Sequence, residues 1–354
     1  MGFVRFALFF FVYFPGLTWA HSNCEAVLTG YSPDLNFHFI NQRHAEDKTA
    51  VAAKAQRLKI ATWNLDLLDR TGARSPNYVI RSERIQFFLA DYLKREQPDI
   101  LMLQEVWKEP DYARTIDTAA KAGYFSVGSL ASGPNHGLLM FIKPGTVAGV
   151  EASGFSPLNG YGWVSFEWLG RIQRGLLWAK VKLSDNRSLI VTNTHLTPFV
   201  TYVGTRFKQT TAMTALLKFM SYKRDYIIAG GDFNIAADFA TRSQKKYLEL
   251  RNAQWLYETF TKTSGLRDAY RSIEPRNPGF TFNADFHPKY SAPEVRADKR
   301  LDYIFVGEGN DRSRVHVVDS KIEFLGKIDG LYPSDHYLLQ FTLDLFQTQD
   351  TQPD

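Results

Sequence analysis

The residues with the clearest chemical potential lie in the run Ala229-Gly230-Gly231-Asp232-Phe233-Asn234. Residues 226–229 form an apolar stretch that predicts a short buried strand, and the two glycines predict a tight turn at its end. The turn would deliver a carboxylate, Asp232, and a carboxamide, Asn234, two positions apart at the mouth of the fold. This pair suits an oxygen-rich site that works with a cation.

Other apolar strands also border on polar groups that could share one site. A carboxylate such as Glu105, which follows the apolar run 100–103, is costly to bury unless it is paired or binds a cation. An inward carboxylate early in a strand, as at Asp302, caps a buried donor or orients a histidine. Taken singly, each group could be structural, but their joint occurrence favours one site. The remaining members of the set are Asn64, His195, Asp335 and His336.

The elements that must position these groups follow from hydrophobic periodicity. Helices are expected around 85–93, over 205–221 and over 243–259, and Ala212, Ala215, Leu216, Phe219 and Met220 share one face of the second. Mixed strands with interposed helices predict a four-layer α/β/β/α sandwich, with two mixed sheets packed face to face and helices outside. The expected strands are 58–63, 100–103, 137–142, 162–168, 175–183, 188–194, 226–229, 301–306, 315–324 and 336–345.

Bulk composition and the N-terminus set limits on class and location. Residues 1–20 read as a secretory signal peptide cleaved near Ala20, and residues 21–56 as a polar arm. The catalytic domain is expected over 57–346, followed by a tail at 347–354. No later segment is long and apolar enough to span a bilayer. We therefore expect a secreted or periplasmic monomer.

Cysteine usage and charge exclude two classes of site. The single cysteine, Cys24, rules out an internal disulfide and a cysteine-based metal site. The formal charge of +5 suits an anionic substrate or membrane surface, but it falls short of a nucleic-acid-binding signature.

The order and spacing of these groups resemble those of the endonuclease/exonuclease/phosphatase superfamily. This superfamily includes pancreatic-type DNases, inositol-polyphosphate phosphatases and neutral sphingomyelinases. The resemblance covers about residues 57–345, nearly the whole chain after the expected leader. It rests on Asn64, Gln104-Glu105, Thr194-His195, Gly231-Asp232-Phe233-Asn234, Leu301-Asp302-Tyr303 and Ser334-Asp335-His336.

The resemblance implies a metal-dependent phosphodiesterase. Glu105 would bind Mg²⁺, or another divalent cation such as Mn²⁺, helped by Asn64, and Asp335 would support the metal or the histidine. These are the predicted metal ligands. The cofactor, one ion or two, would be divalent.

The resemblance also implies the catalytic residues. His336 would act as general base on the attacking water, with Asp302 fixing its tautomer. Asp232 and Asn234 would position the water and the phosphoryl oxygens. His195 would donate a hydrogen bond to the charge growing on phosphorus oxygens or on the leaving group.

A finer resemblance is to bacterial secreted neutral sphingomyelinases. It rests on Pro278-Gly279-Phe280-Thr281-Phe282-Asn283, on Gln173-Arg174-Gly175, and on Arg206 and Gln209. This chain carries Asn283 where that branch often has an aspartate. We therefore expect a sphingomyelinase or phospholipase C-type enzyme, with a secreted DNase-like endonuclease or an inositol-polyphosphate phosphatase as the alternative. A catalytically silent binding protein on the same scaffold is disfavoured because all the site groups are retained.

Aromatic residues near the expected site leave the substrate surface open. The stretch 155–169 is dense in aromatics, and Phe199 and Tyr202 follow His195 closely. If exposed, these side chains would contact a membrane surface, because Trp and Tyr prefer the headgroup boundary. Alternatively, Val164, Phe166 and Trp168 form one buried strand face at period two.

Overall fold

The computed structural model describes residues 55–347, apart from 71–72, 75–76, 128–135, 159–171, 185, 222–224, 242–243, 287–296 and 308–312. The expected signal peptide, nearly all of the expected arm, and the expected strand 162–168 lie outside the described residues. The first strand begins one residue before the expected domain boundary, at Gln56.

Two six-stranded sheets form the centre of the described domain. In both, parallel and antiparallel pairs are mixed: β1 is parallel to β4 and antiparallel to β16, and β10 is parallel to β9 and antiparallel to β14. The first sheet has the order β15 (Ser313–Glu323), β16 (Leu338–Gln347), β1 (Gln56–Leu67), β4 (Ile100–Val106), β6 (Leu139–Ile142), β5 (Phe125–Ser126). The second has the order β12 (Arg267–Asp268), β14 (Asp302–Gly307), β10 (Tyr226–Asp232), β9 (Ser188–His195), β8 (Gly175–Leu183), β7 (Val147–Pro157). Two small ladders pair β2 (Asp69–Arg70) with β3 (Ala73–Arg74), and β11 (Phe239–Thr241) with β13 (Ala297–Lys299).

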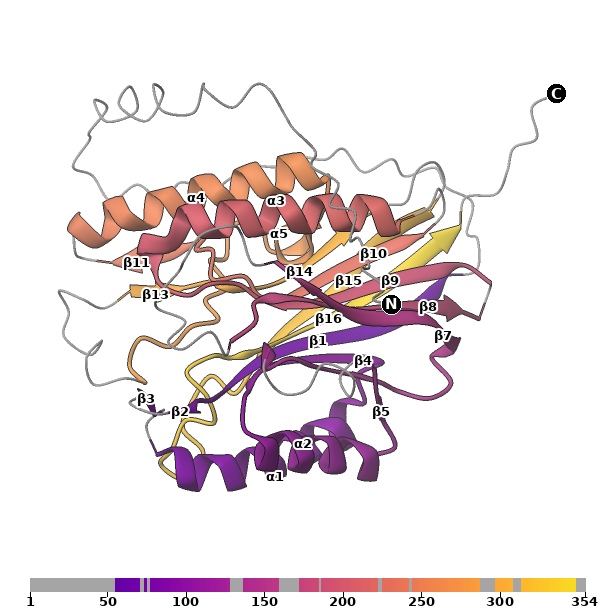
Figure 1. Ribbon diagram of the computed structural model, residues 1–354, viewed down its shortest axis with the longest axis horizontal. Coiled ribbons are helices and arrows are strands. Elements are labelled where there is room, and N and C mark those ends of the chain that lie inside the picture. Colours follow the sequence, from indigo (N-terminus) through magenta and orange to yellow (C-terminus); the bar gives the residue numbers. More distant parts are fainter. Residues whose placement is uncertain are drawn as a thin grey trace, which may run out of the picture. The chain divides into compact units, whose positions relative to one another are not determined.

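Helices cover the outer face of each sheet, which confirms the predicted four-layer sandwich (Figure 1). On the first sheet lie α1 (Tyr78–Glu96) and α2 (Glu109–Lys121), and on the second lie α3 (Val203–Met220), α4 (Gln244–Ser264) and the short α5 (Ala269–Ile273). A short 3₁₀ turn, η2 (Val200–Tyr202), leads into α3. The main core fills the space between the sheets, where side chains such as Met102, Ile228 and Phe341 are fully buried.

Strand pairing brings three of the predicted site residues side by side. Asp232 at the end of β10 lies opposite His195 of β9 on one side and Asp302 of β14 on the other. The turn there needs glycine, because Gly231 has a φ of +128° and an added Cβ would lie 2.1 Å from the carbonyl oxygen of Thr194.

Among the longer elements, three differ from the sequence-based expectation, and the short elements β2, β3, β5, β11, β12, β13 and α5 were not predicted. Helix α2 and strand β7 were not anticipated, because α2 has few apolar residues and β7 is a largely exposed edge strand containing two glycines. The apolar residues that share one face of α3 do not form its buried face, since Phe219 is 88% exposed. The inward face is instead formed by Arg206, Gln209, Thr210, Met213, Thr214 and Leu217.

Within the described residues, no helix combines the length and the apolar character needed to cross a membrane.

Candidate active site

All eight predicted site residues gather at one end of the sandwich. They come from the ends of β1, β4, β9 and β10, from the start of β14, and from the loop that precedes β16. Both sheets contribute, so the site lies along the seam between them. The eight residues are Asn64, Glu105, His195, Asp232, Asn234, Asp302, Asp335 and His336.

Asn64 joins the carboxylates of the two sheets. Its Nδ2 donates to Glu105 Oε1 and to Asp232 Oδ2, each at 3.1 Å. Its Oδ1 accepts the backbone N–H of Asp66 at 2.9 Å, a side-chain turn that fixes the amide. The amide nitrogen therefore faces the carboxylates, and the predicted role of Asn64 as an oxygen ligand to a metal stays a prediction.

The buried side chain of Arg81 stabilises the turn that follows Asn64. Arg81 of α1 donates from Nη1 to Asp66 Oδ2 at 2.7 Å and from Nη2 to the carbonyl oxygens of Leu65 and Asp66. Because Arg81 and Asp66 are both buried, this charge-assisted pair positions Asn64 from the first turn of the helix. This pair was not predicted from the sequence. The Asn-x-Asp spacing after the strand was the available signal.

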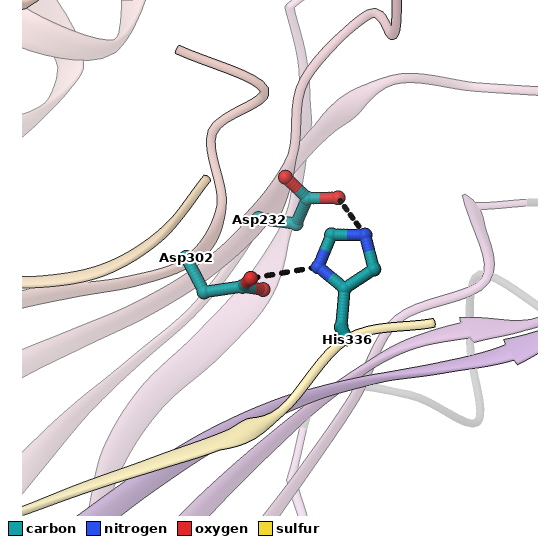
Figure 2. A group of neighbouring side chains, drawn as sticks. All are labelled: Asp232, Asp302 and His336. Carbon is teal, nitrogen blue, oxygen red and sulfur yellow. Dashed lines mark hydrogen bonds and ion pairs between the residues drawn. The ribbon is translucent and has the colours of Figure 1, made fainter. Parts of the chain in front are cut away.

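His336 and Asp302 form a buried hydrogen-bonded pair, called the dyad below (Figure 2). Its Nδ1 lies 2.7 Å from Asp302 Oδ2, so that the N–H points to the carboxylate and Nε2 faces the site. Nε2 lies 3.7 Å from Asp232 Oδ2 and 3.9 Å from Asp335 Oδ1. Burial lowers the pKa of His336, but the charges of Asp302, Asp232 and Asp335 outweigh it and hold this pKa well above the ordinary value. The geometry, with Nδ1 bonded to Asp302 and Nε2 facing the site, is that of a general base with an orienting carboxylate. Because the raised pKa favours the protonated ring, this role requires a bound cation, whose charge would lower the pKa of His336.

The chain behind this dyad is held by a threonine. Thr281 Oγ1 accepts the backbone N–H groups of Leu301 and Asp302, each at 3.0 Å, and its own carbonyl accepts the N–H of Tyr337 at 2.7 Å. The ring of Phe282 packs edge-on against His336, with centroids 5.4 Å apart. The segment that carried the finer resemblance therefore braces the base.

His195 supplies a neutral donor on the other side of Asp232. Burial first, and then the charges of Arg174 and His336, lower the pKa of His195 well below its ordinary value. Its Nε2 lies 3.4 Å from Asp232 Oδ2 and 3.7 Å from Glu105 Oε1. Asn234 completes this corner, because its backbone N–H donates to Asp232 Oδ1 at 2.8 Å and its Nδ2 donates to Leu196 O at 3.1 Å.

Two site residues occupy strained backbone conformations. Glu105 has a φ of 61° and Asn234 a φ of 52°, although neither is glycine. Left-handed conformations in non-glycine residues cost free energy and persist where the surroundings impose them, often at functional sites. From these conformations Asn234 Nδ2 lies 3.2 Å from Asp232 Oδ2, and Glu105 Oε1 accepts from Asn64.

The donor set fits a hard divalent cation. Burial, and then the charge of Asp335, raise the pKa of Glu105, and burial also raises the pKa of Asp232 despite the nearby His336. Among the described residues, ligand atoms of Asp232, Asp302 and His336 lie within 4.8 Å of one another, a group that differs from the predicted ligands Asn64, Glu105 and Asp335, and Asp302 Oδ1 has no hydrogen-bond partner there. Buried carboxylates that cost free energy when charged are relieved by a bound cation with oxygen ligands.

Comparison with known proteins identifies relatives of this arrangement. Residues 61–336 match the Endonuclease/Exonuclease/phosphatase family. Over 296 residues, the chain is 23% identical to an inositol phosphosphingolipids phospholipase C of Schizosaccharomyces pombe, a match that covers 75% of this chain and 64% of that protein. The chain thus spans a little under two thirds of the length of this relative.

Solved structures share the fold at low identity. A humanized D. rerio TDP2 is 18% identical with a TM-score of 0.59, covering 81% of this chain and 99% of its own. A D. rerio TDP2 complexed with a single strand DNA product is 22% identical with a TM-score of 0.58, covering 81% and 98%. An endonuclease/exonuclease/phosphatase from Bacteroides vulgatus is 21% identical with a TM-score of 0.57, covering 82% and 99%.

Proposed function

The chain belongs to the endonuclease/exonuclease/phosphatase family, and from this membership we propose that it is a metal-dependent phosphodiesterase of the phospholipase C type. The observation that carries the proposal is the His336–Asp302 dyad, whose free Nε2 faces Asp232 at the seam of the two sheets. Members of this family are hydrolases that act on phosphodiester bonds with divalent metals. The substrate class, the ion and the cellular location are proposals.

Hydrolysis needs a base for water, a donor for developing charge, and a fixed geometry. His336 takes the proton of the attacking water at Nε2, while Asp302 holds the Nδ1–H and stabilises the imidazolium that results. The oxygen of the water forms a bond to phosphorus as the bond from phosphorus to the leaving oxygen breaks. Proton transfer by such a group contributes on the order of 10²- to 10⁴-fold.

The remaining residues stabilise charge. His195, which is neutral because it is buried, donates from Nε2 toward the phosphoryl oxygens or the leaving oxygen. Asp232 and Asn234 orient the water and the phosphoryl group. Glu105 and Asp335 would hold a divalent cation such as Mg²⁺ or Mn²⁺, which would neutralise charge on the phosphoryl oxygens when bound, while the amide of Asn64 fixes the carboxylate of Glu105.

The choice of a phospholipid substrate has one main support. The curated relative in Schizosaccharomyces pombe is a phospholipase C for inositol phosphosphingolipids. The motif Pro278 to Asn283, which resembles neutral sphingomyelinases, lies in the site as the brace of the dyad. We accordingly propose a sphingomyelinase or related phospholipase C that releases a phosphorylated headgroup. We also propose export after cleavage near Ala20, to the periplasm or the outside of the cell.

A side-by-side assay tests this proposal. The purified protein would be given sphingomyelin, phosphatidylcholine, plasmid DNA and an inositol polyphosphate, each with Mg²⁺ and with EDTA. We expect Mg²⁺-dependent release of phosphocholine from a lipid. Nicking of the plasmid, or release of inorganic phosphate from the inositol polyphosphate, without lipid cleavage would instead assign the alternative activity.

A further inference from the structure

Two pairs of aromatic rings lie where the chain leaves β9 and enters the outer helices: Phe199 with Tyr202 at the entry to α3, and Phe207 with Trp255 on α3 and α4. We call Phe199, Tyr202, Phe207 and Trp255 the aromatic ledge. Phe199 is 58% exposed and Trp255 is 53% exposed, and the rings of Phe207 and Trp255 stack with centroids 5.7 Å apart. Phe199 and Tyr202 also lie ring to ring, at 6.4 Å. Large aromatic side chains at such exposure cost free energy in water unless a partner covers them.

The ledge is tied directly to the catalytic strands. Three residues separate Phe199 from His195, and the first of them, Leu196, makes two hydrogen bonds to the site. Its N–H donates to the carbonyl oxygen of Asp232 at 2.9 Å, and its carbonyl oxygen accepts Nδ2 of Asn234 at 3.1 Å. A molecule that covers the ledge therefore lies next to the site.

Buried polar groups hold the tip of the ledge in place. Arg206, which is almost fully buried, donates from Nη1 to the carbonyl oxygens of Thr197 and Phe199 at 2.8 and 2.6 Å. Gln209 exchanges two hydrogen bonds with Thr197, one with its N–H and one with its hydroxyl. These are the residues that give α3 its unexpected polar inner face.

Phe199 has a strained backbone conformation, and its ring is exposed to solvent. Its φ of 66° and ψ of 133° are rarely adopted by residues other than glycine. A phenylalanine that is kept exposed and strained by several buried hydrogen bonds indicates that the ring has a function outside the folded chain. Core packing would not produce this arrangement.

The charge around the ledge is basic. Among the described side chains of α3 and α4, the exposed charged groups are Lys208, Lys218, Arg251 and Lys262, against a single acid, Glu258. Lys208 follows Phe207, and Arg251 lies one helical turn before Trp255 on the same outward face. Leu248, which is also exposed, lies two turns before Trp255 and extends the apolar strip.

From these observations we propose that the aromatic ledge docks on an anionic lipid surface, with Phe199 and Trp255 inserted and Lys208 and Arg251 at the headgroups. Aromatic rings flanked by basic side chains are the usual chemistry of helices that lie in a membrane interface. A nucleic acid is disfavoured, because the arginines nearest the site, Arg81, Arg174 and Arg206, are buried and engaged within the protein. The proposal rests on the proposed phospholipase-type function, since it places a lipid substrate beside the site.

Vesicle sedimentation with matched variants tests the ledge. Phe199→Ser and Trp255→Ser would be compared with Phe87→Ser, which removes an even more exposed phenylalanine from α1 on the opposite layer. The probes are phosphatidylcholine vesicles with and without phosphatidylserine. We expect each ledge variant to bind phosphatidylserine vesicles about tenfold more weakly or worse, from the lost burial of one aromatic side chain, and Phe87→Ser to bind as the unmodified protein does.

Further measurements separate a loss of vesicle binding from a loss of folding or of activity. Hydrolysis of the soluble diester bis(4-nitrophenyl) phosphate should be unchanged in Trp255→Ser, because Trp255 takes no part in the hydrogen bonds that hold residues 197–199 next to the site. If Phe199→Ser does not fold, Trp255→Ser still decides the question. Unaltered vesicle binding in Trp255→Ser would overturn the proposal. The proposal would also be overturned if the ledge variants lost binding to a single-stranded oligonucleotide while their vesicle binding stayed the same. Failure of the unmodified protein to cleave any lipid would remove the proposed function, while the vesicle-binding comparison would still report on the ledge.

Discussion

His336 lies between two carboxylates that have different tasks. Asp302 bonds to Nδ1 at 2.7 Å and holds the ring, whereas Asp232 lies 3.7 Å from Nε2 and shares the reacting side. The first contact is a charge-assisted hydrogen bond, whereas the second is longer than a hydrogen bond, so Nε2 is not tied to Asp232. The ring therefore has one nitrogen, Nδ1, that is fixed by a hydrogen bond, and one nitrogen, Nε2, that faces the site.

The dyad leads to a prediction for turnover. His336→Gln should lower kcat on a phosphodiester substrate by about 10²- to 10⁴-fold, because the variant cannot accept the proton of the attacking water. Stopped or continuous assays with bis(4-nitrophenyl) phosphate would measure it. His316→Gln, at an exposed histidine of β15, is the control and should leave kcat unchanged. Ordinary turnover in His336→Gln, with the fold intact by circular dichroism, would remove His336 from the mechanism.

A second histidine governs stability at acid pH. His136 is 1% exposed, accepts the N–H of Leu138 at Nδ1 and stacks on Phe155, and burial lowers its pKa to about 4. The unfolded chain, with an ordinary value of about 6.5, binds the proton first, so folding is favoured above that pH. The stability that this group contributes is present above about pH 6.5 and is lost as the pH falls toward about 4, by up to about 3 kcal/mol.

Urea unfolding at several pH values would check this expectation. His136→Asn keeps an acceptor for Leu138 but cannot be protonated, so its unfolding free energy should fall less steeply between about pH 6.5 and about pH 4 than that of the unmodified protein. The exposed His316→Gln should retain the original slope. Equal slopes in the His136 variant and the unmodified protein would show that this histidine does not titrate in that range.

At the scale of the elements, the end of β10 depends on a close approach to β9. Gly231→Ala should lower the unfolding free energy by at least about 2 kcal/mol, since the new Cβ would meet the carbonyl oxygen of Thr194 and the φ of +128° disfavours any side chain. Gly204→Ala, on α3 in open space, is the matched control and should be neutral or slightly stabilising. Urea midpoints would measure both, and a Gly231→Ala protein as stable as the unmodified one would refute the steric account.

The strand ends were predictable from the sequence because each apolar run stops at a polar group. Asp232 after 226–229 and Glu105 after 100–103 are examples, and the structure brings both to the same end of the sandwich. The pairing of β10 with β14 was not predictable, since about 70 residues separate the partners and the register emerges only from packing. Helix α3 shows the other limit: its inward face contains Arg206 and Gln209, which hydropathy assigns to solvent, because their hydrogen bonds to the ledge cannot be read from periodicity.

At the scale of the whole molecule, the site exists only when the two sheets are packed together. Asn64 from the first sheet donates to Asp232 from the second, and behind them Gln104 donates to Asn193 across the same seam at 2.7 Å. Each sheet alone holds only part of the constellation. A ligand that binds at the seam therefore binds the folded protein and not the unfolded chain, which couples its concentration to stability.

This coupling allows the metal to be tested without an assay of activity. The pKa values of Glu105 and Asp232 are raised mainly by burial, and that of Glu105 also by the charge of Asp335, so the charged site destabilises the fold until a cation binds. Mg²⁺ at about 100 times its dissociation constant should raise the unfolding free energy by about 2.7 kcal/mol, and EDTA should remove the gain. Glu105→Gln should lose most of this response, whereas Glu83→Gln, at an exposed position of α1, should keep it. If neither Mg²⁺ nor Mn²⁺ moves the urea midpoint of the unmodified protein, these carboxylates do not form a cation site, and the negative charge at the seam must be balanced by protons and by Arg174 instead.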